Sequence, residues 1–211
     1  MKIRHIYKGV FFTSLASIFW GIPQPLFFNE IKFISAIEIV SHRSVWAFIF
    51  LLIIVMFLRK LKEFFLIFKS NKKILFLSGT AILISCNWTG FIIAVSLNRV
   101  QDASMGYYIS PMISIALGYF FLNEKISYLR FISILMMLTS IIFLLISLNT
   151  FPYLALFIAT TWGIYGLLRK QVDISPEVGL LYESGFISLI ALPYLIYLNY
   201  NDLGFFLNHT N

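Results

Sequence analysis

A long apolar run near the N-terminus, residues 9–28, constrains this chain most, because it contains no ionised side chain. About 20 helical residues cross a hydrocarbon core of roughly 30 Å, so the run is long enough to span a bilayer. Further runs of this kind lie at residues 37–58, 74–97, 103–122, 129–148, 152–168 and 178–198. Only 12% of the residues are charged, against about 25% in soluble domains. The sequence therefore predicts an all-α membrane protein, a multi-helix bundle with seven spans.

Lys and Arg are distributed unequally between the two sides that these spans define. Thirteen of the 16 lie before the first span or after the second, fourth and sixth, and only Lys32 and Arg99 lie on the other side. Positive loops remain in the cytoplasm. We therefore expect a cell (inner) membrane protein with a cytoplasmic N-terminus and an external C-terminus. The net charge of +7 then reflects topology, with possible contact to lipid headgroups, and no nucleic-acid surface is expected.

The residues that usually hold metals, disulfides or phosphates are scattered. Cys86 is the single cysteine, and the three histidines lie at 5, 42 and 209. The nine acidic residues occur singly and no Gly-rich phosphate loop is present. We expect no metal site and no cofactor, and the pattern disfavours a membrane-embedded enzyme, which needs clustered carboxylates or histidines.

The motif Trp20-Gly21-Ile22 lies inside the first run and is followed by Pro23. Gly and Pro loosen a helix at a depth where only neighbouring helices or a polar cavity can satisfy the backbone. The motif recurs 142 positions later as Trp162-Gly163-Ile164, which predicts a second loosened helix. The serines that precede the second and seventh spans, Ser35 and Ser175, are 140 positions apart.

These offsets predict an internal repeat. A first unit of five spans, residues 1–148, would be followed by the first two helices of a second unit, residues 149–211. Because five is odd, the second unit starts from the opposite face, so the repeats are inverted, as in several transporter folds.

Capping signals predict where several helices begin and end. They are a capping box at Ser35–Glu38, Ser175 followed by Pro176, Asp102 at the fourth span, and Asn123 as a left-handed C-terminal cap. The segment 59–73 interleaves basic residues with an apolar block and is predicted to lie on the inner membrane surface.

Several stretches together resemble the RarD branch of the EamA family, in the drug/metabolite transporter superfamily. They are Phe19–Ile22, Glu38–Arg43 with Trp46, Asn87-Trp88, Asp102–Tyr108 with Pro111, Glu124, Tyr165–Lys170 and Glu183. The resemblance implies ten helices in two inverted five-helix repeats, and transport of small metabolites or drugs, with chloramphenicol resistance or sensitivity as a common label. The chain departs from the family at Gln24 and Leu26, where a proline and an aromatic residue are usual, and at Asn123, where glycine is usual.

Polar and aromatic residues at mid-membrane depth are the candidate substrate-binding set. They are Trp20, Gln24, Arg43, Asn87, Trp88, Tyr107, Trp162 and Tyr165. Aromatic belts belong at membrane interfaces, so aromatic residues near the centre beside amides indicate a shared cavity. For any single residue, core packing is the alternative, and for Arg43 the alternative is a side chain that reaches the outer headgroups.

Two further ionisable residues, His42 and Glu183, are candidates for proton coupling. A local hydrogen bond near the interface is the alternative for Glu183. Arg43 and Glu183 lie eight residues past equivalent capping serines on helices that start from opposite faces. We therefore expect a separation of about 10 Å or more along the membrane normal and no direct pair.

Three functions remain after these arguments. The first is a permease that moves a small metabolite or amphipathic drug by alternating access. The second is a remnant or subunit that cannot transport alone and needs a complementary C-terminal chain or a second copy, as expected if three helices of a ten-helix fold are missing. A membrane enzyme is the third.

Overall fold

The computed structural model describes residues 2–147 and 151–208, and in these residues the structure is helical with no strand. The helices are α1 (Lys2–Gly21), α2 (Pro23–Glu30), α3 (Ala36–Phe57), α4 (Leu61–Ile67), α5 (Asn71–Ser96), α6 (Val100–Leu122), α7 (Tyr128–Ser147), α8 (Tyr153–Lys170), α9 (Pro176–Tyr200) and α10 (Phe205–Asn208). The predicted all-α membrane bundle is confirmed.

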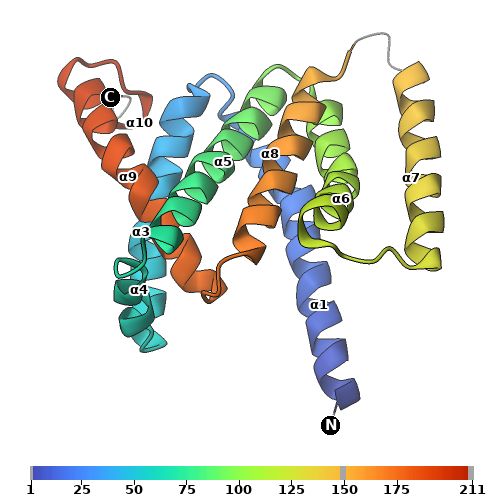
Figure 1. Cartoon of the computed structure of the whole chain (residues 1–211). Helices are drawn as coiled ribbons and strands as arrows, with labels where there is room; N and C mark the ends of the chain where they lie inside the picture. Colours follow the sequence, from blue (N-terminus) through green and yellow to red (C-terminus); the bar gives the residue numbers. More distant parts are fainter. Residues whose placement is uncertain (1, 148–150, 209–211) are drawn as a thin grey trace.

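The long helices alternate in direction along the chain, so that the start of α1 and the end of α9 lie at opposite ends of the molecule (Figure 1). Each of the seven predicted spans corresponds to a helix, with α1 and α2 together forming the first. Five of them are long and apolar enough to cross a membrane: Tyr7–Glu30, Ala36–Phe57, Asn71–Ser96, Val100–Leu122 and Pro176–Tyr200. Within α7, Tyr128–Leu144 is a shorter apolar helix, and α8 ends in two basic residues.

Helix α8 occupies the middle of the bundle, where it packs against both α5 and α6, and α9 packs against α3 and α5. Glycines permit the close approach of α8. A Cβ added to Gly106 would lie 2.8 Å from the Cβ of Ile158, and one added to Gly90 would lie 2.8 Å from Phe157. Helix α7 contacts α6 and stands at the edge of the bundle (Figure 1).

The two Trp-Gly motifs have different roles. The first ends α1 at Gly21, and α2 begins at Pro23, so the predicted interruption is confirmed. The second lies in α8, which continues from Tyr153 to Lys170 without a break. A Cβ on Gly163 would lie 2.6 Å from Ile113 of α6, so this glycine allows close helix packing. The prediction of a second loosened helix is therefore wrong.

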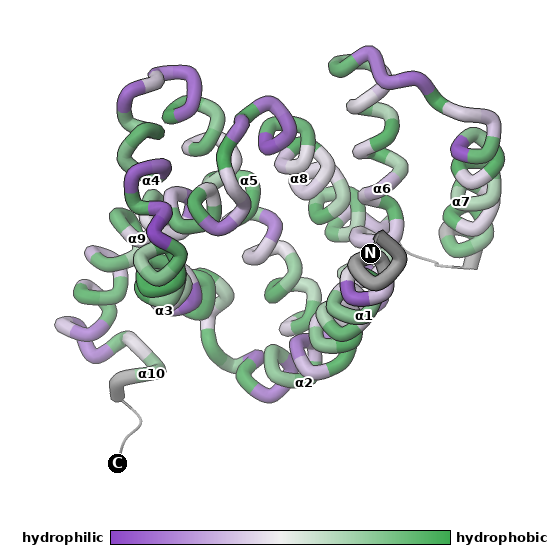
Figure 2. Tube along the Cα trace, turned by 90° about the horizontal axis from the view of Figure 1, so that it is seen from below, coloured by the Kyte–Doolittle hydropathy of each residue, from purple (hydrophilic) through white to green (hydrophobic). Residues whose placement is uncertain are grey.

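The end of the bundle at which α1 starts carries hydrophilic connections, seen from below in Figure 2. The short helix α4 lies in one of them. Lys60 forms an ion pair with Glu177 at the start of α9, and this hydrogen bond raises the pKa of Lys60. Glu63 accepts hydrogen bonds from the backbone N–H and the hydroxyl of Ser175, at 2.6 and 2.9 Å. These bonds attach the α3–α5 connection to α9.

The capping box predicted at Ser35 is wrong, because Ser35 makes no side-chain cap bond. Its partner Glu38 is 4% exposed and instead accepts from the backbone N–H groups of Phe205 and Phe206, at 2.8 and 3.3 Å. Backbone N–H groups at the start of α10 therefore donate to the carboxylate that the sequence predicted as part of the α3 cap.

Of the other three predicted caps, one is confirmed, one is confirmed in part and one is wrong. Pro176 lies in the first turn of α9, but the hydroxyl of Ser175 makes no cap bond. Asn123 is left-handed (φ 53°) and ends α6 as predicted. Asp102 does not cap α6: the helix begins two residues earlier, and the carboxylate pairs with Arg99 at 2.6 Å.

Candidate functional site

A cavity of about 400 Å³ lies among α1, α2, α3, α5, α6 and α8. Its lining residues are Ser17, Trp20, Gly21, Gln24, Pro25, Arg43, Trp88, Phe91, Ser104, Tyr107, Ser110 and Trp162. Six of the eight predicted substrate-binding residues are therefore brought together, from six different helices. The volume is within the range of small-molecule sites.

The break between α1 and α2 places one wall of this cavity. Trp20 and Gly21 end α1, and Gln24 and Pro25 lie in the first turn of α2, so both sides of the break face the same space. The bend therefore directs side chains from the end of α1 and the start of α2 into a cavity whose other walls are formed by α3, α5, α6 and α8.

Arg43 extends from α3 into the cavity, and its guanidinium carbon lies 4.1 Å from the centre of the Trp88 ring. A guanidinium over an indole face is a favourable cation–π contact. Among the described residues no carboxylate lies within 4 Å of Arg43; the ion pairs there join other residues. Arg43 therefore lines the cavity with the Trp88 ring as its neighbour and no carboxylate of the described residues beside it.

Aromatic rings form most of the remaining wall. Tyr107 lies edge-on to Trp162, with ring centres 6.1 Å apart, and tilted against Phe91 at 5.9 Å. Three of the protein's four tryptophans line the cavity. Such walls suit a flat, apolar ligand body.

Asn87 lies one layer behind this wall and is fully buried. Its amide nitrogen donates to the carbonyl of Ile158 at 2.9 Å and to the hydroxyl of Thr161 at 3.1 Å, and its oxygen accepts from Tyr107 at 2.9 Å. The amide thus connects α5, α6 and α8 and fixes the position of Tyr107. It is a positioning residue and not part of the lining.

Tyr165 and Glu183 also lie behind the cavity. Tyr165 stacks on Trp162 with ring centres 5.3 Å apart, and its hydroxyl donates to Glu183 at 3.3 Å. Glu183 is 1% exposed, accepts from Thr80 at 2.7 Å and pairs with Arg169 at 3.6 Å. Its carboxylate thus pairs with Arg169 and not with Arg43, as expected from the opposite directions of α3 and α9.

The sequence analysis counted Arg169 among the basic loop residues and in the RarD-like stretch Tyr165–Lys170, and it did not predict the pair with Glu183. The one available signal was its place in the last turn of α8, beside the turn that leads into α9. His42, the other predicted coupling residue, does not line the cavity. Its ring lies 4.7 Å from that of Phe206, near the start of α10.

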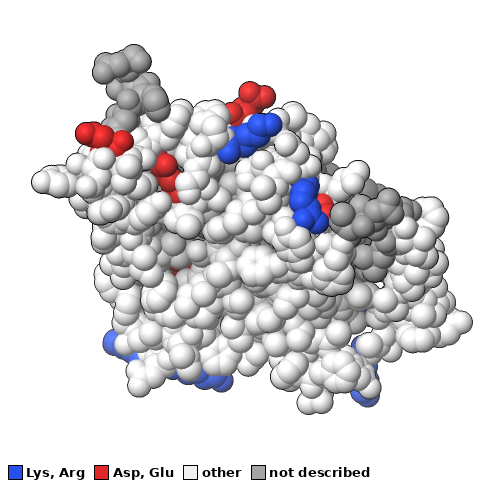
Figure 3. All heavy atoms as spheres, turned by 90° about the horizontal axis from the view of Figure 1, so that it is seen from above, with Lys and Arg blue, Asp and Glu red and all other residues white. Residues whose placement is uncertain are grey.

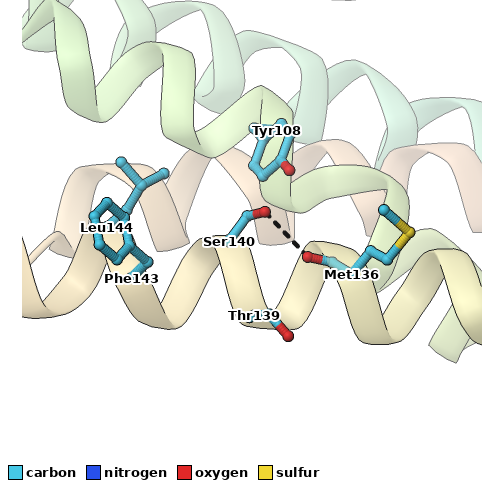
Figure 4. A pocket seen from close by; sticks show the side chains of 6 residues that line it. All are labelled: Tyr108, Met136, Thr139, Ser140, Phe143 and Leu144. Atoms are coloured by element: carbon cyan, nitrogen blue, oxygen red, sulfur yellow. Dashed lines mark hydrogen bonds between the residues drawn. The ribbon is translucent and has the colours of Figure 1, made fainter.

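A second hollow lies between α6 and α7 and is lined by six residues: Tyr108, Met136, Thr139, Ser140, Phe143 and Leu144 (Figure 4). The hydroxyl of Ser140 donates to the carbonyl of Met136 at 3.0 Å, and that of Thr139 donates to Leu135 at 2.9 Å. Both hydroxyls are satisfied within α7, and no ionised group lines the hollow. The cavity around Arg43 is therefore the candidate site.

The sequence model of the EamA-like transporter family matches residues 7–146. The chain belongs to this family. It is 37% identical over 200 residues to the uncharacterized transporter YojE of Bacillus subtilis, covering 93% of this chain and 67% of that protein. It is 31% identical to the protein RarD of Salmonella typhimurium, covering 92% and 66%. The RarD resemblance is thus confirmed.

A more distant relative from Pseudomonas aeruginosa, 21% identical over 94% of this chain and 67% of its own, is named chloramphenicol-sensitive protein RarD. The chain spans about two thirds of the length of these relatives. No solved structure matches it. As a member of the EamA-like transporter family with several apolar helices, the chain is a multi-pass membrane protein.

Proposed function

We propose that this chain forms the substrate cavity of a permease of the drug/metabolite type, which moves a small metabolite or amphipathic drug by alternating access. The observation that carries the proposal is the convergence of Trp20, Gln24, Arg43, Trp88, Tyr107 and Trp162 on one cavity. Membership in a family of transporters supports a carrier over an enzyme.

The wall formed by α1 and α2 is a candidate for the moving part. Helix α1 packs mainly on α2, α2 packs on α5, and none of the α1 residues with described side chains is buried. The helix ends at Gly21, where the chain bends beside the cavity. A segment with few contacts and a break at the site can change its angle at low cost, as alternating access requires.

Coupling to protons is proposed at Glu183 and His42. Glu183 is buried between α5, α8 and α9 and reaches the cavity wall through Tyr165, which stacks on Trp162. His42 adjoins Arg43 in the chain and contacts α10. Ionisable residues within membrane helices commonly carry such roles.

We place the N-terminus in the cytoplasm and the protein in the inner membrane, on the strength of the basic loops. The face seen from above, at the end where α9 finishes, is mostly uncharged (Figure 3). Lys32 and Arg99 lie in connections at this end. A topology reporter fused after Asn201 should read as external, and a cytoplasmic signal would reverse the assignment.

Binding tests the proposed function directly. The chain in nanodiscs is titrated with a panel of small amphipathic compounds, chloramphenicol included because one relative carries that name. We expect saturable quenching of tryptophan fluorescence by at least one compound. The assay measures binding because a complementary chain or second copy is expected to be needed for transport.

The matched variants are Trp162→Phe and Trp46→Phe. Trp162 lines the cavity, whereas Trp46 does not and is 66% exposed. The first change should remove much of the ligand-dependent quenching, and the second should leave it. Quenching that never saturates, or that disappears with Trp46 alone, would contradict a ligand site in this cavity.

A further inference from the structure

The charge of the cavity follows from its lining residues. Arg43 is ionised, and the other eleven are Trp, Phe, Tyr, Ser, Gln, Gly or Pro, which are uncharged. Arginine stays protonated under all ordinary conditions. The cavity therefore presents one positive charge and no negative one to whatever enters it.

No buried carboxylate of the described residues is left to neutralise this charge. Glu38 accepts hydrogen bonds from the start of α10, Asp102 pairs with Arg99, and Glu183 pairs with Arg169. These three are the buried acids in the part of the chain that the structure describes. Each has its own partner, so no buried carboxylate of the described residues pairs with Arg43.

The face of Trp88 stabilises the guanidinium but uses none of its N–H donors. A planar guanidinium has five such donors in a fork that matches a carboxylate. Two further hydrogen-bonding groups line the same cavity, the amide of Gln24 and the hydroxyl of Ser104. The hydroxyls of Ser17 and Ser110 also line it but donate to the carbonyls of Thr13 and Tyr107, each at 2.9 Å. The polar part of the site is therefore arranged for an anionic oxygen group.

The apolar part of the site is aromatic. Trp20, Trp162, Phe91 and Tyr107 surround the rest of the volume. A flat or aromatic body would replace water against these rings, while a long, flexible chain would gain less from them. A cation would instead face Arg43 at short range in a low-dielectric space with no acid to compensate it.

We propose, resting on the function proposed above, that the substrate is a small planar or aromatic molecule bearing one anionic oxygen group such as a carboxylate. The anion pairs with Arg43 and the ring lies against the tryptophans. Cationic amphipathic drugs are rejected by the same charge. The cavity thus distinguishes ligands by charge first and by shape second.

Three probes with one aromatic body test the proposal: 2-naphthoate, 2-naphthamide and 2-naphthylmethylammonium. Their affinities for the chain in nanodiscs of zwitterionic phosphatidylcholine are measured by calorimetry. We expect the carboxylate to bind about tenfold tighter than the neutral amide, since charge-assisted pairs are about twice as strong as neutral ones, and the ammonium to bind weakest. Equal affinity for the three probes would overturn the proposal.

Arg43→Gln should abolish the roughly tenfold preference for the carboxylate over the amide. Arg43→Lys should retain part of the preference, because the charge remains while the fork is lost. Arg130→Gln is the matched control: Arg130 is exposed on α7, outside the cavity, and its loss should change neither affinity. A preference that survives Arg43→Gln would overturn the proposal.

A lipid phosphate carries the same anionic chemistry, so a second arm adds phosphatidylglycerol to the nanodiscs. If naphthoate still binds saturably, a free small molecule is the ligand. If phosphatidylglycerol removes the naphthoate signal completely, the site is a headgroup site and the proposed substrate class is wrong. If the amide binds and the carboxylate binds no tighter, the charge proposal fails while the proposed function stands. If none of the three probes binds, the proposed function fails.

Discussion

Arg43 and Glu183 each lie eight residues past the serine that precedes their helix, α3 and α9, yet their surroundings are opposite in kind. Glu183 is 1% exposed and has three protein partners: Thr80, Tyr165 and Arg169. Arg43 is half-buried, rests on one aromatic ring and faces a cavity. One charged group is satisfied by the fold and the other is not.

The difference separates two uses of charge in a membrane bundle. A pair closed between helices holds them together, because removal of either member leaves a buried charge. A cation at a cavity wall without an acidic partner lowers the stability of the fold, and an anionic ligand can pair with it. Two glycines also differ in packing: Gly163 of α8 lies tightly against α6, and Gly21 beside the cavity has nothing within 4 Å of an added Cβ.

The largest effect is expected from Arg169→Met. The change leaves the Glu183 carboxylate buried with two neutral donors and no cation. Breaking a buried ion pair in this way lowers the free energy of unfolding by about 3–5 kcal/mol. Equilibrium unfolding in mixed micelles measures it. The double variant Arg169→Met with Glu183→Gln should recover most of the loss, because no charge then remains. A double variant as unstable as the single one would show that the pair is not what holds α8 to α9.

A medium effect is expected from Gly163→Ala. The new Cβ would lie 2.6 Å from Ile113, so α6 and α8 must move apart. We expect the free energy of unfolding to fall by about 1–3 kcal/mol. Gly21→Ala is the control, because nothing lies within 4 Å of a Cβ there. It should not destabilise the chain, since alanine is the better helix residue by about 0.5–1 kcal/mol. Equal losses at both glycines would remove the contrast between the closed and the open region.

The smallest effect is expected from Arg43→Met, which should lower the free energy of unfolding by less than about 1 kcal/mol in the same assay. The variant loses a cation–π contact of about 0.5–1 kcal/mol and gains by removing a charge from an apolar site. No carboxylate is left unpaired, in contrast to Arg169→Met. A loss as large as that of Arg169→Met would mean that Arg43 has a structural partner and is not held for a ligand.

The fold was largely predictable, because apolar runs between charged loops suffice to locate the helices. The end of α6 was predicted at Asn123 for a local reason, a residue type that tolerates φ of 53°. The prediction at Glu38 failed because its true partners, Phe205 and Phe206, are more than 160 residues away. A capping signal is local, and a distant helix end can take the same carboxylate.

The candidate site was predictable as a set and not residue by residue. Mid-membrane aromatic and polar types identified six of the twelve lining residues, because few other reasons place Trp and Arg at that depth. There are two exceptions: the amide of Asn87 points between α6 and α8, and Tyr165 stacks behind Trp162. Helix α5 is apolar on several sides, so its sequence does not fix which residues face the cavity. The pairing of Arg169 with Glu183 was missed because it depends on how α8 and α9 meet.

Cysteine labelling at Ser104 tests the central claim most directly. Ser104 is exposed and lines the cavity with Arg43, so Ser104→Cys in a Cys86→Ala background puts one thiol beside the lone charge. An anionic methanethiosulfonate reagent should modify it faster than a cationic reagent of similar size, and Arg43→Gln should remove the difference. Ser188→Cys, buried on α9, should stay unmodified. Equal rates with both reagents at Ser104→Cys, or no labelling there at all, would contradict a water-accessible cavity with a net positive charge.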